Sequence, residues 1–307
     1  MENPFGFIVI DKPSGITSHD CVNQIRRIFG TRRVGHGGTL DPTVTGVLPI
    51  AIGYATRLLP YLQSDKNYQG VIQLGTRTNT DDLNGEVLLN KSWPKLAESS
   101  LEKYLEAFRG QIEQSPPQVS SVHIKGERAY IRARRGEKVT IPPKPVTIFD
   151  LKLLYWNANL GQLKISVHCS KGTYIRSIAR DLGEAIGCGA CLATLRRTQA
   201  LGFLEEHAFQ LNLNEESVLT KAPPIISPKE ALQHLQRLEL TEKEDALWQT
   251  GSRLYPNSDR YKVSIKSSLK TNNPCILVID SNGHVAGIGL QIGEDTLQPK
   301  VVFNAKG

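Results

Sequence analysis

The spacing of apolar residues divides the first 227 residues into short strands and a few helices. Apolar runs and strict alternation predict strands, whereas apolar residues every three or four positions predict helices. An apolar run at 5–10 precedes a helix that Thr17 or Ser18 can cap and Gly30 can end. Strands are predicted at 5–10, 47–52, 68–74, 86–89, 146–156 and 163–169, and further helices after the Ser99 capping box and after Thr173.

Two pairs of predicted strands lie close enough in the sequence to form hairpins. Residues 68–74 and 86–89 flank a polar turn at 78–85, and 146–156 is followed closely by 163–169. Strands occur in runs with inserted helices, without the regular strand–helix alternation of a doubly wound sheet. This order predicts an α+β fold.

The proline-rich segment 222–228 is the best candidate for a domain boundary. It predicts a larger domain over 1–225 and a small β-rich module over 228–307. In the module, Thr241 and Glu244 form a capping box for a helix. Short strands are predicted there at 261–265, 275–279, 285–290 and 301–303.

The length and the cysteine content are typical of a globular protein that folds without disulfide bonds. A chain of 307 residues with 39 % hydrophobic content can bury its own core. Its five cysteines are odd in number and dispersed, which argues against a disulfide framework and for a reducing compartment. No segment resembles a membrane span of about 20 apolar residues or a signal peptide. We expect a cytoplasmic protein that does not bind membranes.

Positive charge is concentrated in the larger predicted domain. The whole chain carries a net charge of +7, whereas 228–307 holds 10 basic and 9 acidic residues. Residues 125–138 contain six basic and two acidic side chains between flanking prolines. Such a basic insertion suits an arm that grips a phosphate backbone, although a solvated loop has the same pattern.

The glycine-rich loop at 35–42 is the most unusual stretch. Its three glycines and Thr39 remove side-chain bulk around His36 and Asp41, so that a ligand could approach the backbone closely. A carboxylate in this position could act as a nucleophile or a base. An ordinary tight turn in which Asp41 caps neighbouring N–H groups fits the spacing as well.

A second constellation, residues 171–176, opens a helix with cations near its start. Arg176 and Arg180 are four residues apart, where they repel each other and oppose the helix dipole. One of them could hold a carboxylate or phosphate. Alternatively, Asp181 and Glu184 neutralise both at the surface.

Other motifs argue against cofactor and metal chemistry. The pair Cys188 and Cys191 has C-x-x-C spacing but no second Cys/His pair, so structural cysteines are favoured over zinc. The chain has no Walker A motif, no dinucleotide fingerprint and no nucleophile elbow. We therefore predict no metal and no cofactor.

Taken in order, these pieces resemble the TruB-type tRNA pseudouridine synthases over roughly residues 5 to 215. The family makes pseudouridine at position 55 in the TΨC loop. The matching motifs are Asp11-Lys12-Pro13-Ser14-Gly15, Gly35-His36-Gly37-Gly38-Thr39-Leu40-Asp41-Pro42, Asp65-Lys66-Asn67-Tyr68, Leu74-Gly75 with Thr78, Thr80 and Asp81, His168 through Arg176, Asp181-Leu182-Gly183-Glu184 and Leu195-Arg196-Arg197.

The resemblance implies roles for individual residues. Asp41 would be the nucleophile, Tyr68 would stack on the target uracil and accept a proton, and Arg176 would pair with Asp41. Three further residues would line the substrate pocket, and five would contact RNA. The pocket residues are His36, Tyr174 and Leu195, and the RNA contacts are Lys12, Lys125, Arg128, Arg132 and Arg134.

The family fold implies a mixed, mainly antiparallel sheet flanked by helices, with a small C-terminal module of the PUA-like or TruB type. An RNA-gripping thumb would occupy about 114–143. The implied partner is the TΨC stem-loop of tRNA, bound by a monomer without a cofactor. Two other hypotheses stay open: a non-catalytic RNA-binding or RNA-folding protein on this scaffold, and a synthase for a different stem-loop. Attack at C1′ and addition at C6 are equally compatible with the sequence.

Overall fold

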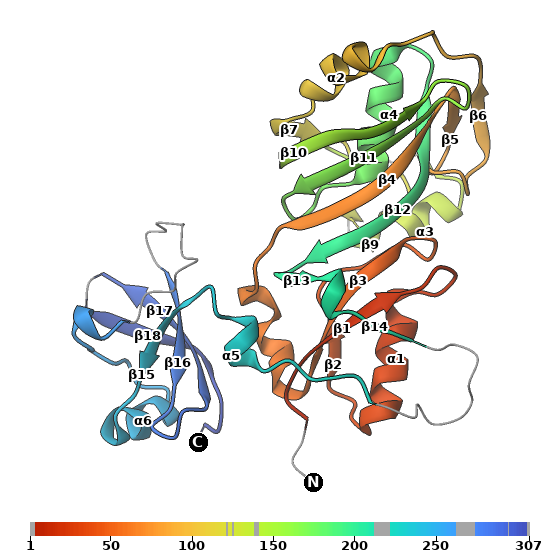
Figure 1. The fold of residues 1–307 in the computed structure, drawn as a ribbon. Helices are drawn as coiled ribbons and strands as arrows, with labels where there is room; N and C mark the ends of the chain where they lie inside the picture. The colour runs from red at the N-terminus through yellow and green to blue at the C-terminus, as the bar shows by residue number, and fades with distance from the viewer. Residues whose placement is uncertain are drawn as a thin grey trace.

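A computed structural model describes residues 4–120, 122–124, 126–137, 141–211, 222–261, 274–293 and 295–305. The side chains of residues 134 and 258 are not included in the description. Figure 1 shows a large sheet with helices packed against it, and a smaller β-rich unit beside its N-terminal half.

The large sheet is mixed and mainly antiparallel, which confirms the predicted fold class. Its main path runs β14-β1-β3-β12-β4-β11-β10-β7, with β2 paired to β3 and β13 paired to β12. Only the pairs β1–β14 and β3–β12 are parallel among the pairs of this described sheet. The strands are β1 (Gly6–Lys12), β2 (Val34–His36), β3 (Thr45–Ile52), β4 (Lys66–Leu74), β7 (Gly110–Gln114), β10 (Lys144–Asn157), β11 (Gln162–Cys169), β12 (Ala190–Ala200), β13 (Phe203–Leu204) and β14 (Phe209–Gln210).

Helices and smaller strands complete the described chain. Short strands β5 (Thr76–Thr78) and β6 (Val87–Asn90) form one pair, and β8 (His123–Ile124) and β9 (Glu127–Arg128) form another. The helices are α1 (Ser18–Phe29), η1 (Gly53–Tyr61), α2 (Glu98–Glu106), α3 (Ala129–Arg134), α4 (Ile175–Ile186), η2 (Glu205–His207), α5 (Pro228–Ala231), α6 (Glu242–Gln249) and η3 (Ser258–Arg260).

Helix α1 begins and ends where its sequence predicts. The Thr17 hydroxyl accepts a hydrogen bond from the Asp20 backbone N–H at 3.1 Å, and the Asp20 carboxylate accepts one from the Thr17 N–H at 2.8 Å. Gly30 ends the helix in the left-handed conformation with φ of +60°. The capping box at Thr17 fixes the first turn of α1, which lines the cavity described below.

Strand β1 is buried on both faces, which explains its continuous apolar run. Ile8 and Ile10 pack with α1, whereas Phe7 and Val9 point to the other side of the sheet and pack with the smaller β-rich unit.

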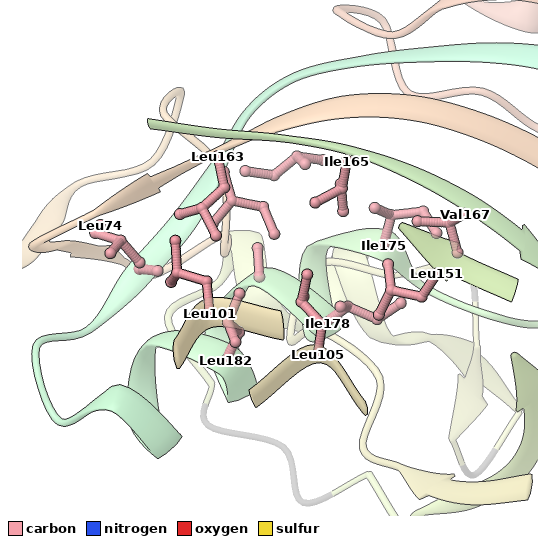
Figure 2. Close-up of a cluster of buried hydrophobic side chains, with 14 of the residues drawn as sticks. Leu74, Leu101, Leu105, Leu151, Leu163, Ile165, Val167, Ile175, Ile178 and Leu182 are labelled. Atoms are coloured by element: carbon pink, nitrogen blue, oxygen red, sulfur yellow. The ribbon is translucent and has the colours of Figure 1, made fainter. Parts of the chain in front are cut away.

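A second core lies between the other half of the sheet and helices α2 and α4. Figure 2 shows leucines and isoleucines of the strands and both helices meeting there. Leu101 and Leu105 of α2 and Ile178 and Leu182 of α4 are fully buried against Leu163 of β11. The helical spacing of these residues places one apolar stripe of each helix on the sheet.

Two sequence predictions about local pairing are wrong. Strands β4 and β6 do not form a hairpin, because β11 and β12 occupy both edges of β4 and the chain turns at Gly75 into β5, which pairs with β6. Helix α2 begins before Ser99, with Ala97 as an N-cap that makes no side-chain hydrogen bond, and Glu102 pairs with Arg109 instead of closing a capping box.

The smaller unit is a four-stranded sheet in the order β15-β16-β17-β18. Its strands are β15 (Gln236–Glu239), β16 (Cys275–Ile279), β17 (Val285–Ile292) and β18 (Thr296–Val302). Strands β16 and β17 match predicted strands, β18 overlaps the strand predicted at 301–303 only at its last two residues, and β15 was not predicted. The strand predicted at 261–265 falls almost entirely outside the described residues. The capping box of Thr241 and Glu244 opens α6 as predicted. Leu277, Ile288 and Phe303 join Phe7 and Leu58 in one shared hydrophobic cluster, so the unit is packed firmly on the large sheet.

Replacement of Leu182 by alanine tests the α4 core. Its side chain is fully buried, so Leu182→Ala leaves a cavity and is expected to lower the free energy of unfolding by about 2–5 kcal/mol. Leu154→Ala is the matched control, because Leu154 is 46 % exposed and its loss is expected to cost below about 1 kcal/mol. Urea denaturation measures both. Equal losses for the two variants would contradict the described packing.

Candidate active site

The loop that carries Asp41 is fixed on both sides of this residue. Asp41 lies between β2 and β3. The Ser18 hydroxyl accepts from the Leu40 N–H at 2.9 Å, and the Val44 N–H donates to the Asp41 carbonyl at 3.0 Å. The Pro42 carbonyl accepts from the Lys12 ammonium at 3.0 Å. The backbone is thus held by α1 and β1, which leaves the carboxylate free to face a cavity.

Lys12 is buried inside the protein, whereas the resemblance implied that it contacts RNA. Its side chain is fully buried, and its ammonium also donates to the carbonyls of Pro13 and Ile16, each at 2.8 Å. Burial lowers the pKa of Lys12, against the opposing effects of Cys21 and Asp41. All three ammonium protons are used inside the protein, so the predicted contact of Lys12 with RNA is not supported. Lys12 instead ties the 13–16 turn to the Asp41 loop.

The glycines of the loop serve packing as well as access. A Cβ at Gly37 would lie 2.1 Å from a methyl carbon of Leu201, so any other residue here would require the Leu201 side chain to move. Gly38 has φ of +139° and lies beside the ends of Lys66 and Arg197. The sequence predicted close approach of a ligand to this backbone, and the structure shows close approach of protein side chains.

Arg176 forms an ion pair with Asp41 across the sheet. Its Nη2 lies 2.9 Å from Asp41 Oδ2, and its guanidinium also donates to the carbonyls of Thr80 and Val119. The Arg176 side chain is only 9 % exposed, whereas that of Asp41 is 44 % exposed. A fixed, buried cation therefore faces a carboxylate with room for another partner.

The first turn of α4 holds Arg176 in place. The Tyr174 N–H donates to Gln114 Oε1 at 2.8 Å, and Gln114 Nε2 donates to the Tyr174 carbonyl at 3.1 Å. One turn later, Arg180 pairs with Asp81 at 3.0 Å and with Asp181 at 2.7 Å. Both interpretations of the two arginines therefore hold in part: Arg176 binds a loop carboxylate, and Asp181 helps to neutralise Arg180.

One cavity of about 550 Å³ collects the residues predicted for the pocket. Its volume lies in the usual range for small-ligand sites. A second cavity of about 600 Å³ shares Asp41, Val44, Arg176 and Leu195 with the first, so the ion pair forms part of both walls. The predicted residues that line the first cavity are His36, Asp41, Tyr68, Arg128, Tyr174, Arg176 and Leu195.

Tyr68 lines the cavity, and Arg197 is buried beside it. Burial raises the pKa of Tyr68, while the nearby Arg197 guanidinium acts in the opposite direction. Arg197 is fully buried and donates to the carbonyls of Val47 at 2.7 Å and Gly38 at 3.2 Å. Its Nη1 has no hydrogen-bond partner among the described residues. Sequence reasoning gave Arg197 no role, although alternation along β12 places it on the same face as Leu195.

His36 and Lys66 occupy the side of the cavity near the glycine loop. The Gly38 N–H donates to His36 Nδ1 at 3.2 Å, and burial lowers the pKa of His36, with Arg197 acting in the same direction. His36 is therefore a neutral ring at pH 7. Burial also lowers the pKa of Lys66 to about 8. The sequence contained Lys66 in a family motif but gave no sign of its burial.

The predicted arm is the segment between β7 and β10. Arg128 and Tyr130 line the cavity, whereas Arg132 pairs with Glu137 at 2.7 Å. Lys125 and the side chain of Arg134 lie outside the described residues. Within the described part of the arm, Arg128 is the predicted cation that faces the site.

Lys66→Met is expected to change stability in a pH-dependent way. Lys66 has a pKa of about 8 in the folded protein against an ordinary 10.5, so its buried charge opposes folding at pH 7. Between these values the unfolded chain retains the proton and the folded chain loses it, so wild-type stability rises with pH relative to the variant. The variant should be more stable than wild type at pH 7, by about 3 kcal/mol at most, and should lose most of this advantage by pH 10.

Urea denaturation at pH 7 and pH 10 measures the difference between each variant and wild type. Lys103→Met on the exposed face of α2 is the control and should show no change with pH. A pH-independent difference for Lys66→Met would mean that Lys66 is not buried as described.

The described part of the chain contains neither a metal-binding cluster nor a membrane-spanning helix. No three His, Cys, Asp or Glu side chains among the described residues gather as a metal ion would require. Within the same residues, no helix combines the length and apolar character needed to cross a bilayer. The five cysteines are free, four of them buried.

Comparison with known proteins identifies relatives along the whole chain. A family profile described as TruB family pseudouridylate synthase (N terminal domain) matches residues 26–175, and one described as tRNA pseudouridylate synthase B C-terminal domain matches 176–223. A tRNA pseudouridine synthase B of Parasynechococcus marenigrum (strain WH8102) is 58 % identical over 308 residues. One from Prochlorococcus marinus (strain MIT 9313) is 53 % identical over 320 aligned residues, and both alignments cover 100 % of each chain.

Solved structures share the fold at lower identity. A chain in a Cbf5-Nop10-Gar1 complex matches with a TM-score of 0.70 and 24 % identity, covering 97 % of this chain and 84 % of the other. A chain from an H/ACA RNP bound to a substrate RNA containing 2′-deoxyuridine matches with a TM-score of 0.68 and 21 % identity, covering 97 % and 85 %. The full-length relatives, the matching profiles and the shared fold confirm the resemblance seen in the sequence: the chain belongs to the TruB family of pseudouridylate synthases and is an isomerase.

Proposed function

We propose that the chain converts uridine 55 in the TΨC loop of tRNA to pseudouridine, with Asp41 as the nucleophile. The full-length relatives are named tRNA pseudouridine synthase B, which supports tRNA as the substrate. One observation supports the nucleophile assignment. The Asp41 carboxylate is partly exposed, pairs with the buried Arg176 and lines a cavity of a size that suits a nucleoside.

The reaction needs no external atoms or electrons. The N1–C1′ bond breaks, the base turns, C5 bonds to C1′, the C5 proton leaves and N1 ends with a proton. Asp41 can assist by attacking C1′ or by adding to C6, and in either case the bond it forms is broken again. Arg176 keeps the carboxylate oriented through its 2.9 Å contact, so the nucleophile meets the bound base in a fixed geometry.

Tyr68 is proposed to stack on the uracil ring and to accept the C5 proton. A proton acceptor must be in the phenolate form, which burial disfavours and the Arg197 guanidinium favours. Arg197 is held by two backbone carbonyls, so its charge stays beside Tyr68 while the base is bound.

Three other pocket residues support a flipped nucleotide. Removing a base from its stack costs a few kcal/mol, which contacts with the protein must offset. Tyr174 and Leu195 offer an aromatic and an aliphatic surface in the cavity. His36 is proposed to fill the gap that the nucleotide leaves in the RNA, because a neutral ring can stack there without a desolvated charge.

All of these side chains belong to one chain, so we propose that a monomer is the active species. We assign residues 1–225 to the catalytic domain, about 114–143 to an RNA-gripping thumb, and 228–307 to a C-terminal module. Arg128 is the cation through which the thumb is proposed to meet the RNA backbone near the cavity.

Release of tritium from a 5-tritiated uridine in a TΨC stem-loop transcript tests the reaction. Wild-type protein is expected to release the label, and Asp41→Asn is expected to lose at least about 10³-fold in rate, since an amide is a poor nucleophile. Asp150→Asn on β10 is the control for loss of a carboxylate and should keep full activity, because Asp150 pairs with Lys152 at the surface and does not line the cavity.

Each outcome of the release assay separates the hypotheses. Wild-type protein that binds the transcript without releasing tritium would indicate a non-catalytic RNA-binding protein. Release from another stem-loop but not from this one would indicate a different target. Full activity of Asp41→Asn would refute the assignment of the nucleophile.

A salt titration of transcript binding tests the thumb. If Arg128 contacts one phosphate, Arg128→Ala should reduce the slope of log affinity against log salt by about 1. Arg132→Ala should have a smaller effect, because Glu137 already neutralises Arg132. Circular dichroism checks that both variants remain folded. Identical slopes for Arg128→Ala and wild type would exclude this contact.

A further inference from the structure

Four exposed arginines that the proposed mechanism does not use lie on adjoining elements of the fold. Arg27 lies near the end of α1, Arg32 and Arg33 lie just before β2, and Arg57 lies in η1. These elements adjoin one another, because β2 contacts both α1 and η1. We call this face the arginine surface.

None of these four arginines has a carboxylate partner within 4.0 Å among the described residues, in contrast to Arg176, Arg180 and Arg196, which all form ion pairs. Neighbouring cations repel one another, and nothing in the described fold compensates for them here. Exposed guanidinium groups without carboxylate partners on adjoining elements therefore point to an anionic partner outside the chain.

Aromatic rings order two of the guanidinium groups and leave N–H donors available on both. The Arg33 guanidinium lies 4.3 Å from the ring centroid of Tyr54, which is itself 51 % exposed. The Arg57 guanidinium lies 5.6 Å from the Phe303 ring and donates to the Val302 carbonyl at 2.9 Å. Stacking restricts an arginine while its N–H groups stay available, which lowers the entropy cost of binding phosphate.

Helix α1 connects this surface to the active site. Thr17, Ser18 and His19 at the start of the helix line the cavity. Arg27 follows His19 by eight residues, or about 12 Å along the helix axis. Figure 1 shows α1 running from the loops beside α3 toward the side of the large sheet where β2 and the N-terminus lie.

An RNA with one nucleotide in the cavity carries further phosphates over this distance, since a duplex presents a phosphate charge about every 2 Å of its axis. Planar guanidinium groups bind phosphate oxygens in a bidentate manner. An acidic protein would also satisfy the charge, but the RNA already lies at the other end of the same helix. The RNA is thus the partner that the geometry favours.

We infer that the arginine surface binds backbone phosphates of the same RNA whose uridine enters the cavity. It is a second anchoring point, separate from the thumb, and it rests on the proposed function for the identity of that RNA. Because Arg57 also contacts Phe303 and Val302, the C-terminal unit helps to shape this surface without supplying its unpaired cations.

Filter binding of a full-length tRNA transcript to the double variant Arg32→Ser/Arg33→Ser tests this inference. Both side chains are exposed, so the variant should fold as wild type does, which thermal unfolding verifies. We expect Kd to rise roughly tenfold at 0.1 M salt and the salt slope to fall by about 2. Lys95→Ser/Lys103→Ser removes the same charge from exposed positions at and before α2 and should leave both values unchanged.

A kinetic assay separates this surface from the chemistry. The arginine double variant should show a raised KM with unchanged kcat for tritium release, because the catalytic residues are untouched. Binding and salt slope equal to those of wild type would overturn the inference, as would the same loss in the lysine control. Failure of wild type to release tritium would instead refute the proposed function, and the binding comparison would still test the surface.

Discussion

The ion pair between Asp41 and Arg176 joins the two halves of the large sheet. Asp41 comes from the half built by β1, β3 and α1, and Arg176 comes from the first turn of α4, which packs on the other half. Strand β12 lies between β3 and β4 and connects these halves. Each partner is held by its own backbone contacts, so the 2.9 Å distance depends on the register of the whole sheet.

Buried cations around this pair are held by carbonyl oxygens instead of carboxylates. Lys12 donates to three carbonyls and Arg197 to two. Burying such charges costs several kcal/mol each, and hydrogen bonds to neutral oxygens offset only part of that cost. Arg176 meets Asp41 at 2.9 Å, and Asp82, the other carboxylate within 4.0 Å of it among the described residues, lies 3.8 Å away. The pKa of Lys66 is lowered because burial and the nearby Arg197 both disfavour its charged form.

The C-terminal unit is coupled to the site through β1. Phe7 and Val9 face the unit while Ile8 and Ile10 face α1, so a single strand forms part of both cores. This double burial ties the position of the unit to the strand whose last residue, Lys12, holds the Asp41 loop. The exposed arginines near η1 lie at the junction of the same elements, where the unit contributes Phe303 as a stacking partner for Arg57.

Local patterns in the sequence were sufficient for most elements. The caps at Thr17 and Gly30, the hairpin of β10 and β11, the helix after Thr173 and the capping box at Thr241 depend on neighbouring residues, and all appear as predicted. The partner strands of β4 were not predictable, because both edges of β4 pair with segments about 90 to 130 residues away. Ser99 is not the cap of α2, because the helix already begins at Glu98 and its first backbone hydrogen bonds go to the Ala97 carbonyl.

The sequence by itself determined most of the elements, the family and the set of residues that line the pocket, because these depend on residue type and spacing. Only the tertiary structure decided which charges are buried. Nothing in the sequence distinguishes Lys12 from a surface lysine or Arg197 from Arg196. In the structure both side chains are buried: Lys12 donates to three carbonyls, and Arg197 lies next to Tyr68. Burial is a property of how distant strands pack together, and it sets the pKa and the available partners of each group.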